Sequence, residues 1–210
     1  MKINNILGLL VVVTVIAGCS TTKNLPEGET LYTGIKDIHV NEKDISENGE
    51  KTLEEVTAAV SVAPNNSFLG SAKHRIPIPF GLWVYNSFQK YEKGLGRWIF
   101  RKLAAKPVTV SSVNPDTRVK IASNLLKDYG YFDGNVTYTV DSTRNPRAVK
   151  LSYQINMGKP YLIDTVLYEG FPGRADSLIR KHFDERLIHS NENFDVTRLN
   201  EERERLVTMF

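Results

Sequence analysis

The chain has 210 residues, of which 41% are hydrophobic and 24% charged, and its formal net charge at pH 7 is +3. These proportions are typical of a globular protein and exclude a chain that is mainly disordered, collagen-like or coiled coil. The small net charge gives no reason to expect nucleic acid as a partner. One cysteine excludes an internal disulfide, and four scattered histidines predict neither a metal site nor a cofactor.

The first residues have the pattern of a secretory signal peptide. Lys2 precedes the apolar stretch Ile6–Ile16, which is too short to span a bilayer because a span needs about 20 residues. The stretch leads into Ala17-Gly18-Cys19, which resembles the lipobox of bacterial lipoproteins. The resemblance implies that residues 1–18 are removed and that Cys19 carries a membrane-anchoring lipid. An uncleaved signal anchor, or ordinary cleavage that leaves an idle thiol, is the alternative.

A tether, residues 19–29, is followed by a unit with the order strand, helix, helix, strand, strand, in an α+β fold. The second helix is the clearest, because Pro115 and Asp116 mark its start and Gly130 its end. Alternating apolar residues then predict a hairpin. The expected ranges are strand 31–40, helix 52–60, helix 115–129, strand 132–140 and strand 147–157.

A large insertion, about residues 64–110, separates the two helices of this unit. Its segment Ser71–Lys106 contains eight basic residues, one acidic residue and both tryptophans. Aromatic residues at near-helical spacing among cations are typical of elements that lie at a membrane interface. The pattern predicts docking on a membrane surface or on an acidic partner, and the alternative is a small hydrophobic cluster packed on the first unit, with solvated lysines. The candidate docking residues are Trp83, Tyr85, Phe88, Tyr91, Arg97, Trp98, Arg101 and Lys102.

Residues 159–210 read as the start of a second, similar unit. We expect a β-rich run over 161–168, a helix over 174–182 and another helix from Asp195, with the charged run 201–205 on an exposed face. Leu206 and Phe210 repeat the spacing with which Leu125 and Tyr129 precede Gly130. The second unit is therefore expected to be truncated, so that the chain is a fragment of a longer product or comes from a broken gene.

Three sequence motifs, taken together with this order of elements, resemble the POTRA (polypeptide-transport-associated) domains of the BamA/TamA outer-membrane assembly family, in the lipoprotein form called TamL. The motifs are Leu25-Pro26-Glu27-Gly28-Glu29 after the lipobox, Asp128-Tyr129-Gly130-Tyr131-Phe132 after the second helix, and Tyr161-Leu162-Ile163-Asp164 at the start of the second unit. The resemblance implies tandem POTRA-like units, the first (30–158) with a large insertion. It also implies a lipid-anchored position at the outer membrane, facing the periplasm.

The resemblance further implies that the chain binds unfolded outer-membrane proteins and an envelope assembly partner. In the family the first strand of the hairpin is an exposed sheet edge, which corresponds here to Asn135, Val136, Thr137, Tyr138 and Thr139. No nucleophile and base can be paired in the sequence, so we expect no enzyme. The alternative is a stand-alone outer-membrane lipoprotein scaffold that binds an envelope glycan or another lipoprotein through the insertion.

Overall fold

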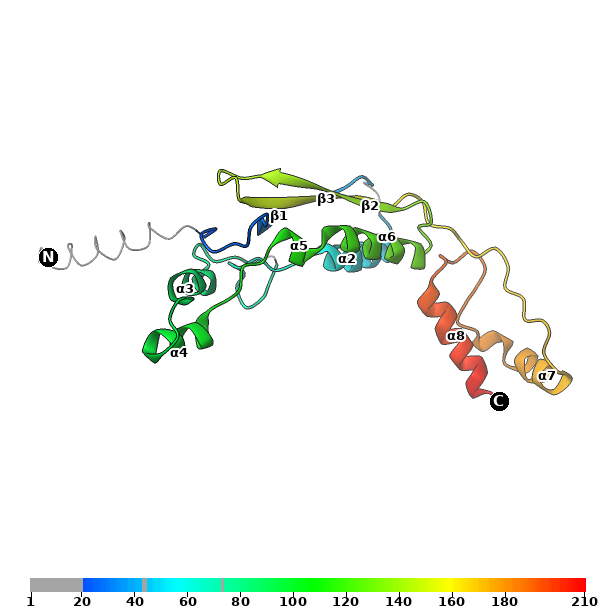
Figure 1. The fold of residues 1–210 in the computed structure, drawn as a ribbon. Coiled ribbons are helices and arrows are strands. Elements are labelled where there is room, and N and C mark those ends of the chain that lie inside the picture. Colours follow the sequence, from blue (N-terminus) through cyan, green and yellow to red (C-terminus); the bar gives the residue numbers. More distant parts are fainter. Residues whose placement is uncertain (1–20, 43–44, 73) are drawn as a thin grey trace, which may run out of the picture. The chain divides into compact units, whose positions relative to one another are not determined.

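A computed structural model describes residues 21–42, 45–72 and 74–210, so Cys19 lies outside the described residues. The fold is mixed α+β, as expected, and its strands are β1 (Leu31–Val40), β2 (Asn135–Ser142) and β3 (Ala148–Asn156) (Figure 1). The chain forms two compact units. Of the described residues, the first unit comprises those of 21–37, 61–115 and 139–152, and the second comprises those of 38–60, 116–138 and 153–210.

The three strands form one mixed sheet in the order β1-β3-β2. The backbone N–H of Leu31 donates to the carbonyl of Arg147, and that of Asn41 donates to the carbonyl of Ile155. Because the partners advance along both strands in the same direction, β1 is parallel to β3. β2 and β3 are antiparallel, since a short turn joins them. β3 is therefore the central strand, and β1 and β2 are the two edges.

In the second unit, α2 (Glu47–Val60) and α6 (Pro115–Asp128) lie side by side and cover one face of the strands (Figure 1). The Arg118 guanidinium of α6 donates to the carbonyl of Ala59 at 2.9 Å. Their inward-facing residues recur at helical spacing and are fully buried with the apolar side chains of β3. This core contains Val56, Val60, Ala122, Leu126, Tyr153 and Ile155.

Two element starts differ from the prediction because of local hydrogen bonds. α2 begins at Glu47 instead of residue 52, and Ser46 supports this earlier start by accepting from the N–H groups of Gly49 and Glu50. β2 begins at Asn135 instead of residue 132, because the N–H of Gly134 donates to the carbonyl of Tyr131 and closes a turn there. The predicted stop at Gly130 is confirmed by its positive φ of 85°.

In the first unit, the insertion forms α3 (Phe80–Phe88) and α4 (Gly94–Leu103), and the short α5 (Val110–Val113) follows at its end. The inner face of α3 is buried in a small core beside the tether and the strands. That core contains Leu25, Leu31, Leu82 and Ala148, with Tyr85 packed against it.

The C-terminal part contains α7 (Gly173–Lys181), a short 3₁₀ helix (Phe183–Glu185) and α8 (Val196–Thr208). The prediction of a β-rich run over 161–168 is wrong. Only an isolated bridge joins Leu162 to Asn193, because Ile163 exchanges its backbone hydrogen bonds with the loop at 191–192 and no ladder extends from it. Within the described ranges, no helix combines the length and the apolar character needed to cross a membrane.

Candidate functional site

The outer edge of β1 is covered by residues of the insertion. Leu31 forms an antiparallel bridge with Thr109, and the N–H of Tyr32 donates to the carbonyl of Val108 at 2.8 Å. Three residues further on, the Arg75 guanidinium donates to the carbonyl of Ile35 at 2.8 Å. The backbone groups at this part of β1 are thus already used, which leaves little for another strand to pair with.

β2 forms the opposite edge and contains the five residues predicted to bind a client strand. Val136 is buried and Tyr138 is half-buried, with its hydroxyl donating to Asp116 of α6 at 3.1 Å. Asn135, Thr137 and Thr139 are exposed. Val140 continues the alternation of apolar residues in the sequence, but 52% of its surface is exposed.

One backbone group of β2 has an unusual partner. The N–H of Val136 donates to the hydroxyl of Ser123 on α6 at 2.9 Å, and so is not used in the ladder with β3. Successive N–H groups along a strand point to opposite sides, so those of Tyr138 and Val140 point the same way as that of Val136. In the described part of the chain no strand pairs with this side of β2. The edge is therefore closed at its start by Ser123 and open beyond it.

Polar side chains connect all three strands across the sheet. In the first unit, Asp141 of β2 accepts from Lys36 of β1 at 2.7 Å and from Ser152 of β3 at 2.5 Å. The hydrogen bond from Lys36 has the largest effect on the pKa of Asp141, and together with the one from Ser152 it holds that pKa below its usual value. In the second unit, Asn156 connects Asn41 with Asn135 in the same way. Such cross-strand pairs fix the register of the edge strand.

The structure divides the predicted docking residues of the insertion into two groups. Trp83, Tyr85 and Phe88 of α3 are half-buried, and their rings pack on other aromatic rings of the insertion. The remaining five, in or beside α4, are exposed: Tyr91, Arg97, Trp98, Arg101 and Lys102. Side chains of α3 therefore belong to a packed cluster, as in the alternative interpretation, whereas α4 is presented to solvent.

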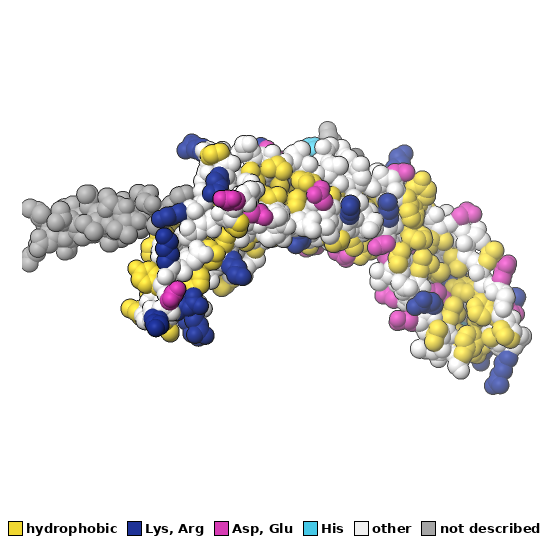
Figure 2. Space-filling view, viewed as in Figure 1, with side chains coloured by type: hydrophobic (Ala, Val, Ile, Leu, Met, Phe, Trp, Pro, Cys, Tyr) yellow, Lys and Arg dark blue, Asp and Glu magenta, His cyan; other side chains and the backbone are white. Residues whose placement is uncertain are grey.

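α4 has no buried residue at all, although its sequence is amphipathic. Leu95 is 72% exposed and Trp98 is 57% exposed, with Tyr91 beside the helix at 52%. Figure 2 shows hydrophobic and basic side chains next to one another in the α3–α4 region. An amphipathic helix with its apolar side exposed indicates an interaction surface.

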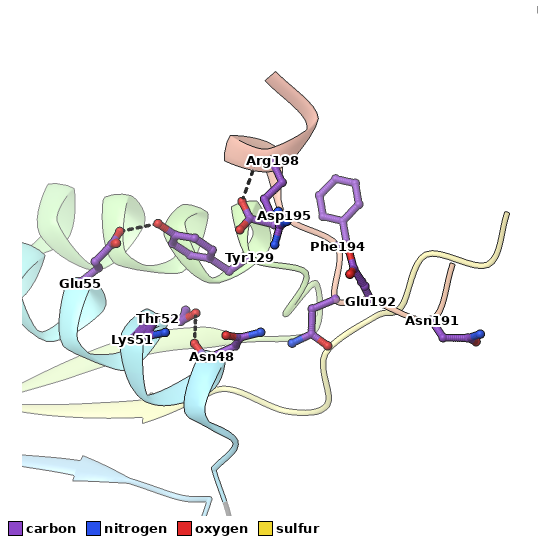
Figure 3. Close-up of a pocket in the computed structure, with 11 residues that line it drawn as sticks. Asn48, Lys51, Thr52, Glu55, Tyr129, Asn191, Glu192, Phe194, Asp195 and Arg198 are labelled. Carbon is purple, nitrogen blue, oxygen red and sulfur yellow. Dashed lines mark hydrogen bonds between the residues drawn. The ribbon is translucent and has the colours of Figure 1, made fainter. Parts of the chain in front are cut away.

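The second unit has a hollow of about 420 Å³ between α2, the end of α6 and the loop 191–195 (Figure 3). Across it, the Tyr129 hydroxyl donates to Glu55 at 2.7 Å. This hydrogen bond and the negative charge of Glu55, together with partial burial, raise the pKa of Tyr129 to about 12. The other carboxylates that line the hollow are engaged as well, since Asp195 caps α8 and Glu192 contacts His189. The hollow thus offers hydrogen-bonding groups rather than a free acid or base.

Sequence reasoning missed a buried carboxylate in α8. Glu202 lies in the run 201–205 that we expected to be exposed, yet its residue surface is only 2% exposed. It accepts hydrogen bonds from Arg205, from the hydroxyl of Tyr168 at 2.7 Å and from the backbone N–H of Leu187 at 2.9 Å. Burial alone would raise the pKa of Glu202, but these hydrogen bonds outweigh it and lower the pKa to about 2.

The histidines of the C-terminal part do not share a helix. His182 ends α7 and contacts Glu185, while His189 lies in a loop and contacts Glu192. Among the described residues, no three metal-ligating side chains gather into a site. Comparison with known protein families, curated proteins and solved structures gives no match for this chain.

Proposed function

We propose that the chain is a POTRA-like interaction module of an outer-membrane protein assembly factor, held at the outer membrane by a lipid on Cys19. Its role is to bind extended segments of unfolded outer-membrane proteins, and it acts by binding and not by catalysis. We also propose that the chain binds an assembly partner in the envelope. The proposal combines the sequence resemblance with the distribution of free backbone groups in the sheet.

The observation that best supports the proposal is the difference between the two edge strands of the sheet, β1 and β2. Residues 108–110 and Arg75 use the outer backbone groups of β1, whereas β2 is open beyond Val136. A client in extended conformation can add to an open edge through main-chain hydrogen bonds, which are almost independent of the client's sequence. Such recognition suits a receptor for many different strands.

The test measures binding of a fluorescent peptide, derived from one transmembrane strand of an outer-membrane barrel, to the mature chain. In the variant Val140→Pro, one N–H that points outward is lost while the ladder with β3 is kept. We expect peptide affinity to fall about tenfold. The control, Val140→Thr, keeps the N–H and should bind like the unmodified chain.

Two readouts separate loss of binding from loss of fold. Circular dichroism and urea unfolding should show that both variants retain the sheet. If Val140→Pro folds and binds the peptide as tightly as Val140→Thr, the edge of β2 is not the binding site and the proposal fails.

A further inference from the structure

The exposed apolar side of α4 is expected to be covered by another molecule or surface. Leu95, Trp98 and Leu103 are large apolar residues, and each has about half or more of its surface exposed. The rest of α4 does not pack into a hydrophobic core either, since none of its residues is buried. A surface of this kind is stabilised when it contacts an apolar or interfacial medium.

The charges around α4 are almost all positive. Five exposed cations surround the apolar residues, and Glu92 is the only acid in the segment from Lys90 to Lys102. In the described part of the chain none of the five takes part in an ion pair. Arg97 lies over the ring of Phe100, 5.5 Å from its centre. The five cations are Lys90, Lys93, Arg97, Arg101 and Lys102.

The tether connects this region closely to the expected lipid anchor. Asn24 donates to the carbonyl of Asn86 in α3 at 3.1 Å, and the Asn86 side chain donates back to the carbonyl of Thr21 at 3.2 Å. Thr21 follows Cys19 by two residues, a distance of at most about 7 Å along the chain. The described start of the tether, two residues after Cys19, is therefore held against α3.

α3 and α4 pack on each other, so the hydrogen bonds between the tether and α3 also link the tether to α4. The rings of Tyr85 and Phe100 join the two helices, with their centres 5.7 Å apart. The guanidinium of Arg147 fixes the tether from its other side by donating to the carbonyls of Thr22 and Leu25. The whole arrangement belongs to the first compact unit.

We propose that α4 and Tyr91 form a membrane-contact surface that binds anionic lipid headgroups of the leaflet into which the lipid of Cys19 inserts. Trp98 and Tyr91 enter the headgroup layer, where amphipathic rings are favoured, and the cations contact lipid phosphates. The contact adds a second attachment to the lipid and fixes the orientation of the first unit on the membrane. It does not depend on client binding at β2.

The test uses the mature chain, residues 19–210, with Cys19→Ser so that no acyl chain contributes. Vesicles of phosphatidylcholine, with and without phosphatidylglycerol, are sedimented with the protein. We expect at least about tenfold tighter binding to the anionic vesicles, weakened by added salt. Reversing three cations, in Arg97→Glu, Arg101→Glu and Lys102→Glu combined, should lower that binding by about tenfold or more.

A matched control reverses three exposed cations elsewhere, Lys120→Glu, Lys127→Glu and Arg144→Glu, and should keep the binding if α4 is the contact surface. Trp98→Ala should weaken binding as well. In the parent protein Trp98 fluorescence should shift to shorter wavelength on binding, and the half-buried Trp83, which remains in Trp98→Ala, should show no such shift.

Three results would overturn the proposal. The first is no binding to anionic vesicles. The second is equal loss of binding in the two charge-reversed variants, which would indicate a general charge effect. The third is binding to soluble polyglutamate in place of vesicles, which would assign the surface to an acidic protein.

Discussion

The guanidinium of Arg75 lies against Gly34 so closely that no side chain fits between them. A Cβ atom added at Gly34 would be 2.5 Å from the central carbon of the guanidinium. Gly34 also has a φ of 108°, which residues with a side chain rarely adopt. The glycine thus lets an arginine of the insertion cross the edge of β1 and bind the carbonyls of Thr33 and Ile35.

We expect Gly34→Ala to lower the free energy of unfolding by about 2 kcal/mol, because it adds backbone strain and also displaces Arg75. Gly28→Ala is the matched control, since Gly28 has a φ of 76° and open space around it. It should show the strain alone, about 1 kcal/mol. Urea unfolding measures both, and equal losses would show that the contact with Arg75 contributes nothing.

Glu202 should make the free energy of unfolding depend on pH in the acidic range. Its pKa in the folded state is about 2, below its ordinary value of 4.5, so the charged form is stabilised by folding. This contribution is complete above about pH 4.5 and is lost as the pH falls towards 2. It amounts to at most about 3 kcal/mol.

Glu202→Gln should therefore lower the free energy of unfolding at neutral pH and flatten its dependence on pH between 4.5 and 2. The neighbouring exposed Glu201 offers the control Glu201→Gln, which should leave the curve unchanged. Urea unfolding at a series of pH values checks this, and parallel curves for both variants would contradict the assigned role of Glu202.

Ser123→Ala should open the first position of the β2 edge. The N–H of Val136 then loses its partner, which costs about 1 kcal/mol of stability. The freed group can pair with a client strand, so peptide affinity should rise by a few fold. Ser142→Ala, at the exposed end of the same strand, is the control. A fall in affinity for Ser123→Ala would show that the hydroxyl helps to bind the client instead of closing the edge.

Local patterns predicted most of the strands and helices between residues 31 and 157. The range of β1 is as expected, and Pro115 and Gly130 bound α6 because proline and a glycine of positive φ have strong positional preferences. The alternation of apolar and polar residues likewise predicted the hairpin of β2 and β3. The predicted edge residues lie on an edge strand, since the order β1-β3-β2 leaves β2 with a strand on one side only.

What depends on contacts distant in sequence could not be predicted. The cover on β1 comes from Arg75 and residues 108–110, and no periodicity indicates where an insertion returns. Glu202 reads as one more charge on a polar helix, because its partners Tyr168 and Leu187 are fixed only by the fold. The run 161–168 has the composition of a strand but lacks a ladder partner among the described residues.

The pair Tyr129 and Glu55 gives a spectroscopic prediction for the hollow in the second unit. Tyr129 and Tyr168 both have a pKa of about 12, so the absorbance of tyrosinate should show two late ionisations. In a Tyr168→Phe background, Tyr129 alone remains of that pair. Adding Glu55→Gln should lower the pKa of Tyr129, because the hydrogen bond to the carboxylate is the largest cause of the raised pKa and the negative charge of Glu55 adds to it. Glu54→Gln, an exposed neighbour on α2, is the control and should leave the late ionisation in place. An unchanged titration in Glu55→Gln would show that the hydroxyl of Tyr129 does not donate to Glu55 in solution.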